Sequence, residues 1–133
     1  MFDVQGVTIQ SPLQNVFPYI ADAAKLPEWT NAFSSVGNGK ALLQTPNGKV
    51  EIGLEVRSSA QHGTVDWRMT FPDGNVATAF SRVVPLDSES CAYTFVLLPP
   101  PVPLEMLEGV LAEQSLTLTR ELKELKSLLE NKA

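Results

Sequence analysis

The sequence of 133 residues contains a single cysteine, Cys91, and a single histidine, His62. One cysteine cannot form an internal disulfide, and the two residues together fall short of the ligand set of a zinc site. We therefore expect no metal and no cofactor, and no catalytic motif is identifiable. Free cysteine is among the residue types most often buried, so Cys91 is expected in the core and His62 in a turn.

Long apolar runs and clusters of basic residues are also missing. No run approaches the roughly 20 residues that a membrane-spanning helix needs, and the N-terminal MFDVQGV lacks the basic and apolar segments of a signal peptide. Ten Lys and Arg against fifteen Asp and Glu give a formal net charge of −5. Binding to nucleic-acid phosphates requires basic clusters, which are absent. We expect a cytoplasmic protein without a transmembrane segment or a nucleic-acid partner.

The pattern that is present indicates one α+β domain over residues 1–133. VQGVTIQ alternates as a first strand does, and the segment SPLQNVFPYIADAAKLPEWT predicts two short helices. Ser11 is suited to the N-cap and Pro12 to the first helical position. Pro18 is expected to kink or shorten the first helix, because proline removes a backbone donor and crowds the preceding turn.

Residues 35–98 alternate in short segments separated by the turn signals PNGK, AQHG, PDGN and PLDSES. This texture is typical of an antiparallel meander and accommodates five strands, so that the sheet would have about six. After the prolines of PPPVP, a helix is expected from about Leu104 to about Glu130, with leucines along one side. At the standard helical rise it would be roughly 40 Å long.

The turns also predict which side chains share a face of the sheet, because an even hairpin loop places its flanking residues opposite each other. Even loops at PDGN and at Asp87-Ser88 would set Trp67 opposite Phe80, and both Val65 and Tyr93 opposite Arg82. Nearly every large apolar residue then falls on one face together with Arg82. The opposite face would collect polar or small residues: Glu51, Glu55, Arg57, Asp66, Arg68, Ala77, Ala79 and Ser81.

This order of elements, with SPLQNVFPYIADAAKLPEWT near the start and LTLTRELKELKSLLE at the end, resembles the START and birch-pollen-allergen superfamily, also called SRPBCC. The similarity is closest to small bacterial members labelled polyketide cyclase/dehydrase-like, and it covers almost the whole chain. The positions that match the opening helices are Pro12, Asp22, Leu26, Pro27 and Trp29, whereas Pro18 departs from them. The resemblance implies a helix-grip fold, in which a curved antiparallel sheet surrounds a long C-terminal helix and encloses an apolar cavity.

Thirteen residues are candidates for ligand contacts in such a cavity. They are Trp29, Trp67, Met69, Phe71, Phe80, Arg82, Tyr93, Phe95, Leu107, Leu111, Gln114, Ser115 and Leu118. Among them, Arg82, Tyr93, Gln114 and Ser115 could form a polar cluster that anchors a carboxylate, phosphate or carbonyl oxygen. Two alternatives remain open: the apolar residues simply fill a core, and Arg82 reaches water or pairs with Glu89.

Three classes of function fit these features. The first is binding or transport of a hydrophobic or amphipathic small molecule, such as a lipid or polyketide-like compound. The second is a polyketide cyclase or dehydratase-like enzyme, which would need an acid or base in the cavity, and the face analysis places no His or carboxylate there. The third is an interaction module with a filled cavity, in which Met106, Gly109 and Leu116 would form a homodimer contact on the outer side of the long helix.

Overall fold

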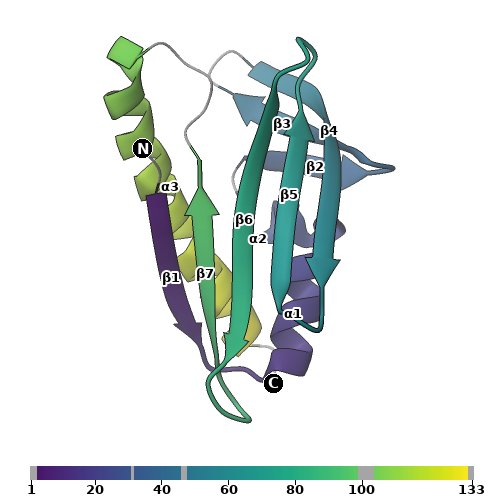
Figure 1. The fold of residues 1–133 in the computed structure, drawn as a ribbon, viewed down its shortest axis with the longest axis vertical. Helices are drawn as coiled ribbons and strands as arrows, with labels where there is room; N and C mark the ends of the chain where they lie inside the picture. The colour runs from purple at the N-terminus through teal and green to yellow at the C-terminus, as the bar shows by residue number, and fades with distance from the viewer. Residues whose placement is uncertain (1–2, 31, 46–47, 99–103, 132–133) are drawn as a thin grey trace.

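A computed structural model describes residues 3–30, 32–45, 48–98 and 104–131, and for Asp3, Thr45 and residues 104–111 it describes the backbone alone. The elements follow the predicted order (Figure 1). In chain order they are β1 (Asp3–Ile9), α1 (Leu13–Ala21), the 3-10 helix η1 (Ala23–Lys25), α2 (Leu26–Trp29), β2 (Phe33–Gly37), β3 (Lys40–Thr45), β4 (Gly48–Ser59), β5 (Thr64–Thr70), β6 (Val76–Pro85), β7 (Cys91–Leu97) and α3 (Leu104–Glu130). The bounds of α3 agree with those expected from the leucine spacing.

The sheet is antiparallel, curved and unclosed. Its seven described strands lie in the order β1-β7-β6-β5-β4-β3-β2, one more strand than the expected count of about six. All helices lie on one face of this sheet, with α3 running diagonally behind β1 and β7 (Figure 1). The predicted α+β helix-grip architecture is therefore confirmed.

The register between β5 and β6 differs from the prediction by one residue. Trp67 pairs with Ala79 rather than with Phe80, because the loop between the paired Thr70 and Val76 has an odd number of residues. Gly74 closes the turn by donating to the Phe71 carbonyl at 2.9 Å and has a φ of +89°. A type I turn followed by a left-handed residue is the usual three-residue hairpin, and it reverses the face expected from an even loop.

The hairpin between β6 and β7 also has an odd loop. Pro85 pairs with Cys91, and the Asp87 side chain stabilises the turn between them by accepting from the Glu89 amide at 2.8 Å and from Ser90 Oγ at 2.9 Å. Both loops are odd where even loops were expected, and the two reversals together return the side chains of β7 to their predicted faces. Tyr93 therefore does face the helices, but its partner is Val83 and not Arg82.

The prediction for the side chains of β6 is consequently wrong. Ala77, Ala79 and Ser81 belong to the concave face that was assigned to the large residues, whereas Phe80 and Arg82 point outward. At the two earlier hairpins, even loops would set Val56 opposite Met69 and Leu43 opposite Ile52. The observed partners are Trp67 and Val50, each shifted by two residues. A shift of two leaves each side chain on its predicted face.

Helix α1 begins one residue later than expected. Pro12 and not Ser11 occupies the N-cap position, and the carbonyl of Pro12 accepts from the amides of Asn15 and Val16. The Ser11 side chain is buried, and its carbonyl accepts a weak hydrogen bond from Cys91 Sγ at 3.4 Å. Cys91 is fully buried, as predicted, and burial raises the pKa of its thiol.

The close-packed core lies between α1, the second half of α3 and the lower half of the sheet in Figure 1. Its fully buried side chains include Ile9, Val16, Ile20, Val83 and Leu125. Polar contacts join α3 to β1 alongside this core: Gln5 Nε2 donates to the Ser115 carbonyl at 2.9 Å, and Lys126 Nζ donates to the Thr8 carbonyl. These contacts attach α3 to β1 at two points along the helix, Ser115 and Lys126.

Candidate functional site: an apolar cavity between sheet and helix

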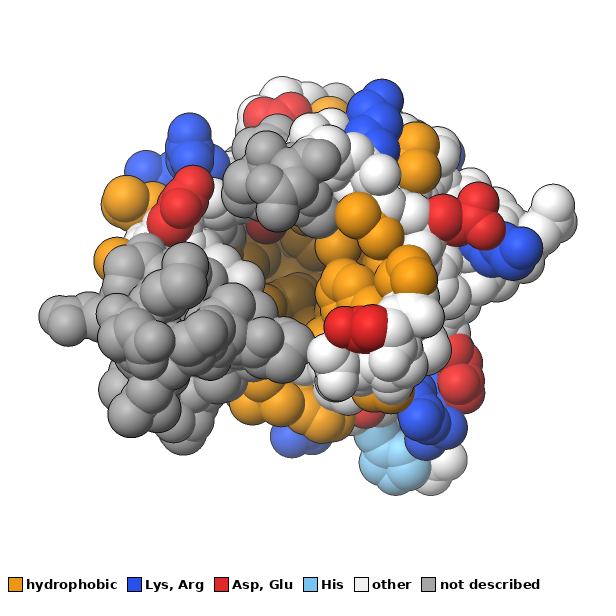
Figure 2. Space-filling model, turned by 90° about the horizontal axis from the view of Figure 1, so that it is seen from above, with side chains coloured by type: hydrophobic (Ala, Val, Ile, Leu, Met, Phe, Trp, Pro, Cys, Tyr) orange, Lys and Arg blue, Asp and Glu red, His pale blue; other side chains and the backbone are white. Residues whose placement is uncertain are grey.

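A cavity of about 420 Å³ lies between the concave face of the sheet, α2 and the middle of α3. Figure 2 looks into its mouth from the upper end of the molecule in Figure 1, and the interior is lined mainly with hydrophobic side chains. The volume falls within the range of about 300–1,000 Å³ that is usual for small-molecule sites. The cavity exists because the small residues Ala77 and Ala79 of β6 face inward. They leave space that Phe80 would have filled if it had been on that face.

The described residues that line this cavity come from every layer of the fold. They are Leu26, Trp29, Thr30, Ala32, Phe33, Leu43, Gln44, Trp67, Met69, Phe71, Ala77, Thr78, Ala79, Phe95, Leu97, Leu98, Glu113, Gln114, Thr117, Leu118 and Glu121.

Aromatic side chains make up much of the wall. Five of the ten aromatic residues of the chain (six Phe, two Trp and two Tyr) line the cavity, and both tryptophans are among them. Trp67 stacks on Phe95 with ring centroids 5.6 Å apart, and Trp29 lies tilted against Trp67 at 6.4 Å. Such contacts fix the rings in place and present a rigid apolar surface to a ligand.

Three buried polar atoms on this wall have no hydrogen-bond partner among the described residues: Trp29 Nε1, Trp67 Nε1 and Gln114 Oε1. A buried donor or acceptor without a partner typically costs about 1–3 kcal/mol. Trp29 and Trp67 are 4% and 3% exposed, so the protein itself gives their N–H groups little access to water. The acidic side chains that line the cavity are Glu113 and Glu121, both from α3.

Solved structures with the same architecture span this chain from end to end. A START superfamily protein from Mycobacterium smegmatis is 12% identical, with a TM-score of 0.69 and 99% of each chain covered. The chain has the START-like helix-grip fold. The Zhui aromatase/cyclase from Streptomyces sp. R1128 matches this START-like fold with a TM-score of 0.68 at 12% identity, covering 98% of this chain and 93% of its own. The protein DR_A0006 from Deinococcus radiodurans matches with a TM-score of 0.72 at 17% identity over the whole of both chains.

No protein-family model matches the sequence, and no curated protein is similar to it by sequence comparison. Identities of 12% to 17% relate the chain to the START-like fold and do not indicate its ligand.

The cavity brings together seven of the thirteen predicted site residues. These are Trp29, Trp67, Met69, Phe71, Phe95, Gln114 and Leu118. Leu107 and Leu111 lie in the part of α3 whose side chains are outside the described residues. Direct contact of these nine residues with a ligand stays a prediction.

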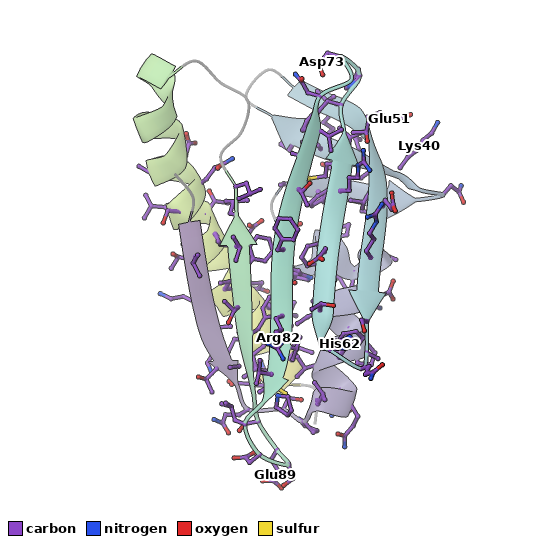
Figure 3. The ribbon with its side chains drawn as sticks, viewed as in Figure 1. Lys40, Glu51, His62, Asp73, Arg82 and Glu89 are labelled. Atoms are coloured by element: carbon purple, nitrogen blue, oxygen red, sulfur yellow. The ribbon has the colours of Figure 1, made fainter. Side chains whose placement is uncertain are left out.

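The predicted polar cluster around Arg82 does not form. Arg82 lies on the convex face, where its Nε donates to the His62 carbonyl at 3.3 Å, and the two residues lie near each other in Figure 3. Phe80 is also on that face and is 41% exposed. The odd loop before β6 is the physical cause of both errors, and Arg82 therefore cannot anchor a ligand inside the sheet.

Tyr93 and Ser115 point toward the interior of the fold but do not line the cavity. Tyr93 is fully buried next to Phe95, and burial raises the pKa of its phenol, an effect that the nearby Ser81 hydroxyl partly offsets. Ser115 faces β1, where its Oγ accepts from Gln5 Nε2 at 3.1 Å. Both residues contribute to the packing beside the cavity rather than to its wall.

Sequence reasoning missed the acidic residues of the wall. The exposed Glu113 and the half-buried Glu121 border the cavity, a position that the predicted faces gave to no carboxylate. A signal was present: Gln114, Leu118 and Glu121 are spaced by four and three residues, which places them along one side of a helix.

The predicted dimer contact can be located only in part. Leu116 is 66% exposed on α3, whereas only the backbone is described at Met106 and Gly109. One protein with the same fold, from Colwellia psychrerythraea, was solved as an Aha1 dimer, with a TM-score of 0.66 at 15% identity. Self-association of the present chain stays a prediction.

Two further features bear on possible partners. Within residues 3–30, 32–45, 48–98 and 104–131, no group of three or more His, Cys, Asp or Glu side chains is placed to hold a metal ion. None of the helices described in the structure combines the length and apolarity that crossing a bilayer requires.

Proposed function

We propose that the protein binds a hydrophobic small molecule in the cavity between its sheet and α3. The observation that carries this proposal is an apolar space of about 420 Å³ whose wall includes five aromatic side chains. Empty apolar volume inside a protein is destabilising, because the lining atoms lose their dispersion contacts. A ligand that fills the cavity restores those contacts and removes its own apolar surface from water.

The shape of the site favours a compact ligand with a planar part. Trp67 and Phe95 are stacked at 5.6 Å, with an angle of 27° between the rings, so a flat molecule bound beside them can extend the stack. Met69 lies on the sheet wall and Leu118 on the opposing helix wall. The flexible Met69 side chain can adjust to the outline of the ligand. The mouth in Figure 2 gives such a molecule a route from solvent.

Blocking the cavity tests this proposal. Ala79 is 4% exposed on the inner face of β6 and lines the cavity, so Ala79→Phe directs a ring into the space that the ligand would occupy. We expect the neutral fluorescent probe N-phenyl-1-naphthylamine to bind the wild-type protein and to bind Ala79→Phe at least about tenfold more weakly.

The matched control is Ala60→Phe, the same substitution at an exposed position in the turn between β4 and β5. Circular dichroism establishes that both variants are folded. Equal probe affinity for the wild type and folded Ala79→Phe would contradict binding in this cavity.

A second candidate function is acid-base catalysis on a bound carbonyl compound. Glu113 and Glu121 line the cavity, and a carboxyl group positioned beside a bound substrate can transfer a proton. One protein with the same fold is an aromatase/cyclase. An enzyme of this kind should lose turnover in Glu113→Gln or Glu121→Gln while it retains the affinity for N-phenyl-1-naphthylamine, and parallel loss of both would argue for a structural effect.

A further inference from the structure

The cavity wall is asymmetric in charge. Among the residues that the structure describes, its charged side chains are the exposed Glu113 and the half-buried Glu121, and none is Lys, Arg or His. Basic residues of the sheet such as Arg57, Arg68 and Arg82 are exposed and do not line the cavity.

This arrangement is unfavourable for an anionic ligand. A carboxylate that enters an apolar site loses its hydration, and it recovers that free energy only through a cation or several strong hydrogen-bond donors. Among the described lining residues it would find no cationic side chain, and the carboxylates of Glu113 and Glu121 would repel it. A fatty acid or an aromatic acid is therefore a poor ligand for this site.

The unpartnered donors on the wall point to a different polar group. Trp29 Nε1 and Trp67 Nε1 are buried N–H groups without an acceptor among the described residues. An uncharged carbonyl oxygen can accept a hydrogen bond from an indole N–H, and its desolvation costs far less than that of a carboxylate. The two tryptophan rings are neighbours, with centroids 6.4 Å apart, and both side chains line the cavity, so an acceptor bound there would lie close to both.

We propose that the cavity selects uncharged aromatic ligands that carry a carbonyl oxygen and rejects carboxylates of the same shape. This inference rests on the proposed function, because it specifies the ligand of the same cavity. Selectivity arises from the absence of a cation, from repulsion by Glu113 and Glu121, and from the indole donors of Trp29 and Trp67. An Arg82 anchor would have favoured an anionic ligand, whereas this cavity favours an uncharged one.

A pair of nearly isosteric probes tests the inference. 2-Acetonaphthone and 2-naphthoate share the same ring system and a carbonyl oxygen, and they differ in charge. Isothermal titration calorimetry at pH 7 should give an affinity for the ketone at least about tenfold higher than for the acid. In the double variant Glu113→Gln/Glu121→Gln we expect the ratio to fall below about threefold through tighter binding of naphthoate.

Glu89→Gln is the matched control, because Glu89 lies in the loop at the opposite end of the molecule (Figure 3). It should leave the affinity ratio unchanged. Salt provides a readout on the wild-type protein alone: raising the ionic strength screens repulsion, so naphthoate should bind more tightly at high salt while the ketone changes little. This measurement decides the question even if the double variant does not fold.

Equal or tighter binding of naphthoate by the wild-type protein would overturn the inference and leave the proposed function intact. Failure of both naphthalene compounds to bind, while N-phenyl-1-naphthylamine binds in the cavity, would likewise overturn the inference alone. Failure of all three compounds would contradict the proposed function together with the inference.

Discussion

Arg82 and Val83 are neighbours in β6 with opposite environments. Arg82 is exposed on the convex face, whereas Val83 is 2% exposed and packs in the core. The sequence alone could place Tyr93 and Phe95 inward but not Phe80 or Arg82. A strand's faces depend on whether the preceding loop is odd or even, and PDGN is compatible with both. The same ambiguity concealed the small inner residues Ala77 and Ala79 that open the cavity.

Substitutions at these two neighbours test the observed register. Arg82→Ala removes an exposed side chain with one long hydrogen bond and should change the free energy of unfolding by less than about 0.5 kcal/mol. Val83→Ala removes buried methyl groups from a close-packed region and should cost about 2 kcal/mol. Urea denaturation measures both. A larger loss for Arg82→Ala than for Val83→Ala would mean that β6 has the alternative register.

At the scale of single elements, the hairpin between β4 and β5 has a tight backbone contact. Gly63 has a φ of +73°, and a Cβ atom built there would lie 2.2 Å from the Val83 carbonyl oxygen. The Gly63 carbonyl also accepts from the Val83 amide at 2.7 Å, so the turn cannot easily move away. The AQHG turn thus joins β6 as well as the strands on either side of it.

Gly63→Ala should therefore destabilise the protein by more than about 2 kcal/mol, combining backbone strain with a steric clash. Gly74→Ala is the control, because Gly74 also has a positive φ, +89°, but open space around its Cβ position. Strain alone should cost about 1 kcal/mol there. Thermal or urea denaturation distinguishes the two, and similar losses for both would argue against the contact with Val83.

The end of α3 should give a pH-dependent contribution to stability. Glu130 accepts from Lys126 Nζ at 2.6 Å and from the Gln10 amide at 2.8 Å, and these two hydrogen bonds, that from Lys126 first, lower the pKa of its carboxyl group. Because the pKa is lowered in the folded state, the ionised carboxyl stabilises the protein at pH values above the ordinary glutamate pKa of about 4.3. This stabilisation is lost as the pH falls through the lowered value.

Glu130→Gln should accordingly lower the melting temperature at pH 7, and the difference from the wild type should shrink by about pH 3. Melting temperatures recorded from pH 7 to pH 3 measure it. Glu89→Gln, in an exposed loop, serves as the reference for a general charge effect. A difference that stays constant over this range would exclude the Lys126 pair as its source.

The order of elements and the bounds of α3 could be read from the sequence, because periodicity and proline placement are local signals. Whether the space beneath the sheet is filled or hollow could not be predicted from the sequence. It depends on seven strands being in register and on α3 lying across the sheet, so an error of one residue in one loop exchanges a filled core for a cavity. Trp29, Trp67, Met69, Phe71 and Phe95 were nevertheless predicted, since large side chains on strands and helices tend to face inward.

On the scale of the whole molecule, the fold divides into a close-packed end and a hollow end. The second half of α3 packs with α1 and the sheet around Leu122, Leu125 and Leu129, while the cavity lies beside the middle of α3 and opens toward the other end (Figure 2). Such a division allows the close-packed end to stabilise the fold while the hollow end takes up a ligand.

The most direct test of this account is a two-dimensional proton–nitrogen NMR titration with 2-acetonaphthone. The chain has two tryptophans, both on the cavity wall, so the indole region reports on the cavity alone. The account predicts that both indole signals shift and saturate together, while the amide of Glu89 at the far end stays unchanged. Indole signals that do not move at ligand concentrations that shift amides elsewhere would contradict binding in the cavity.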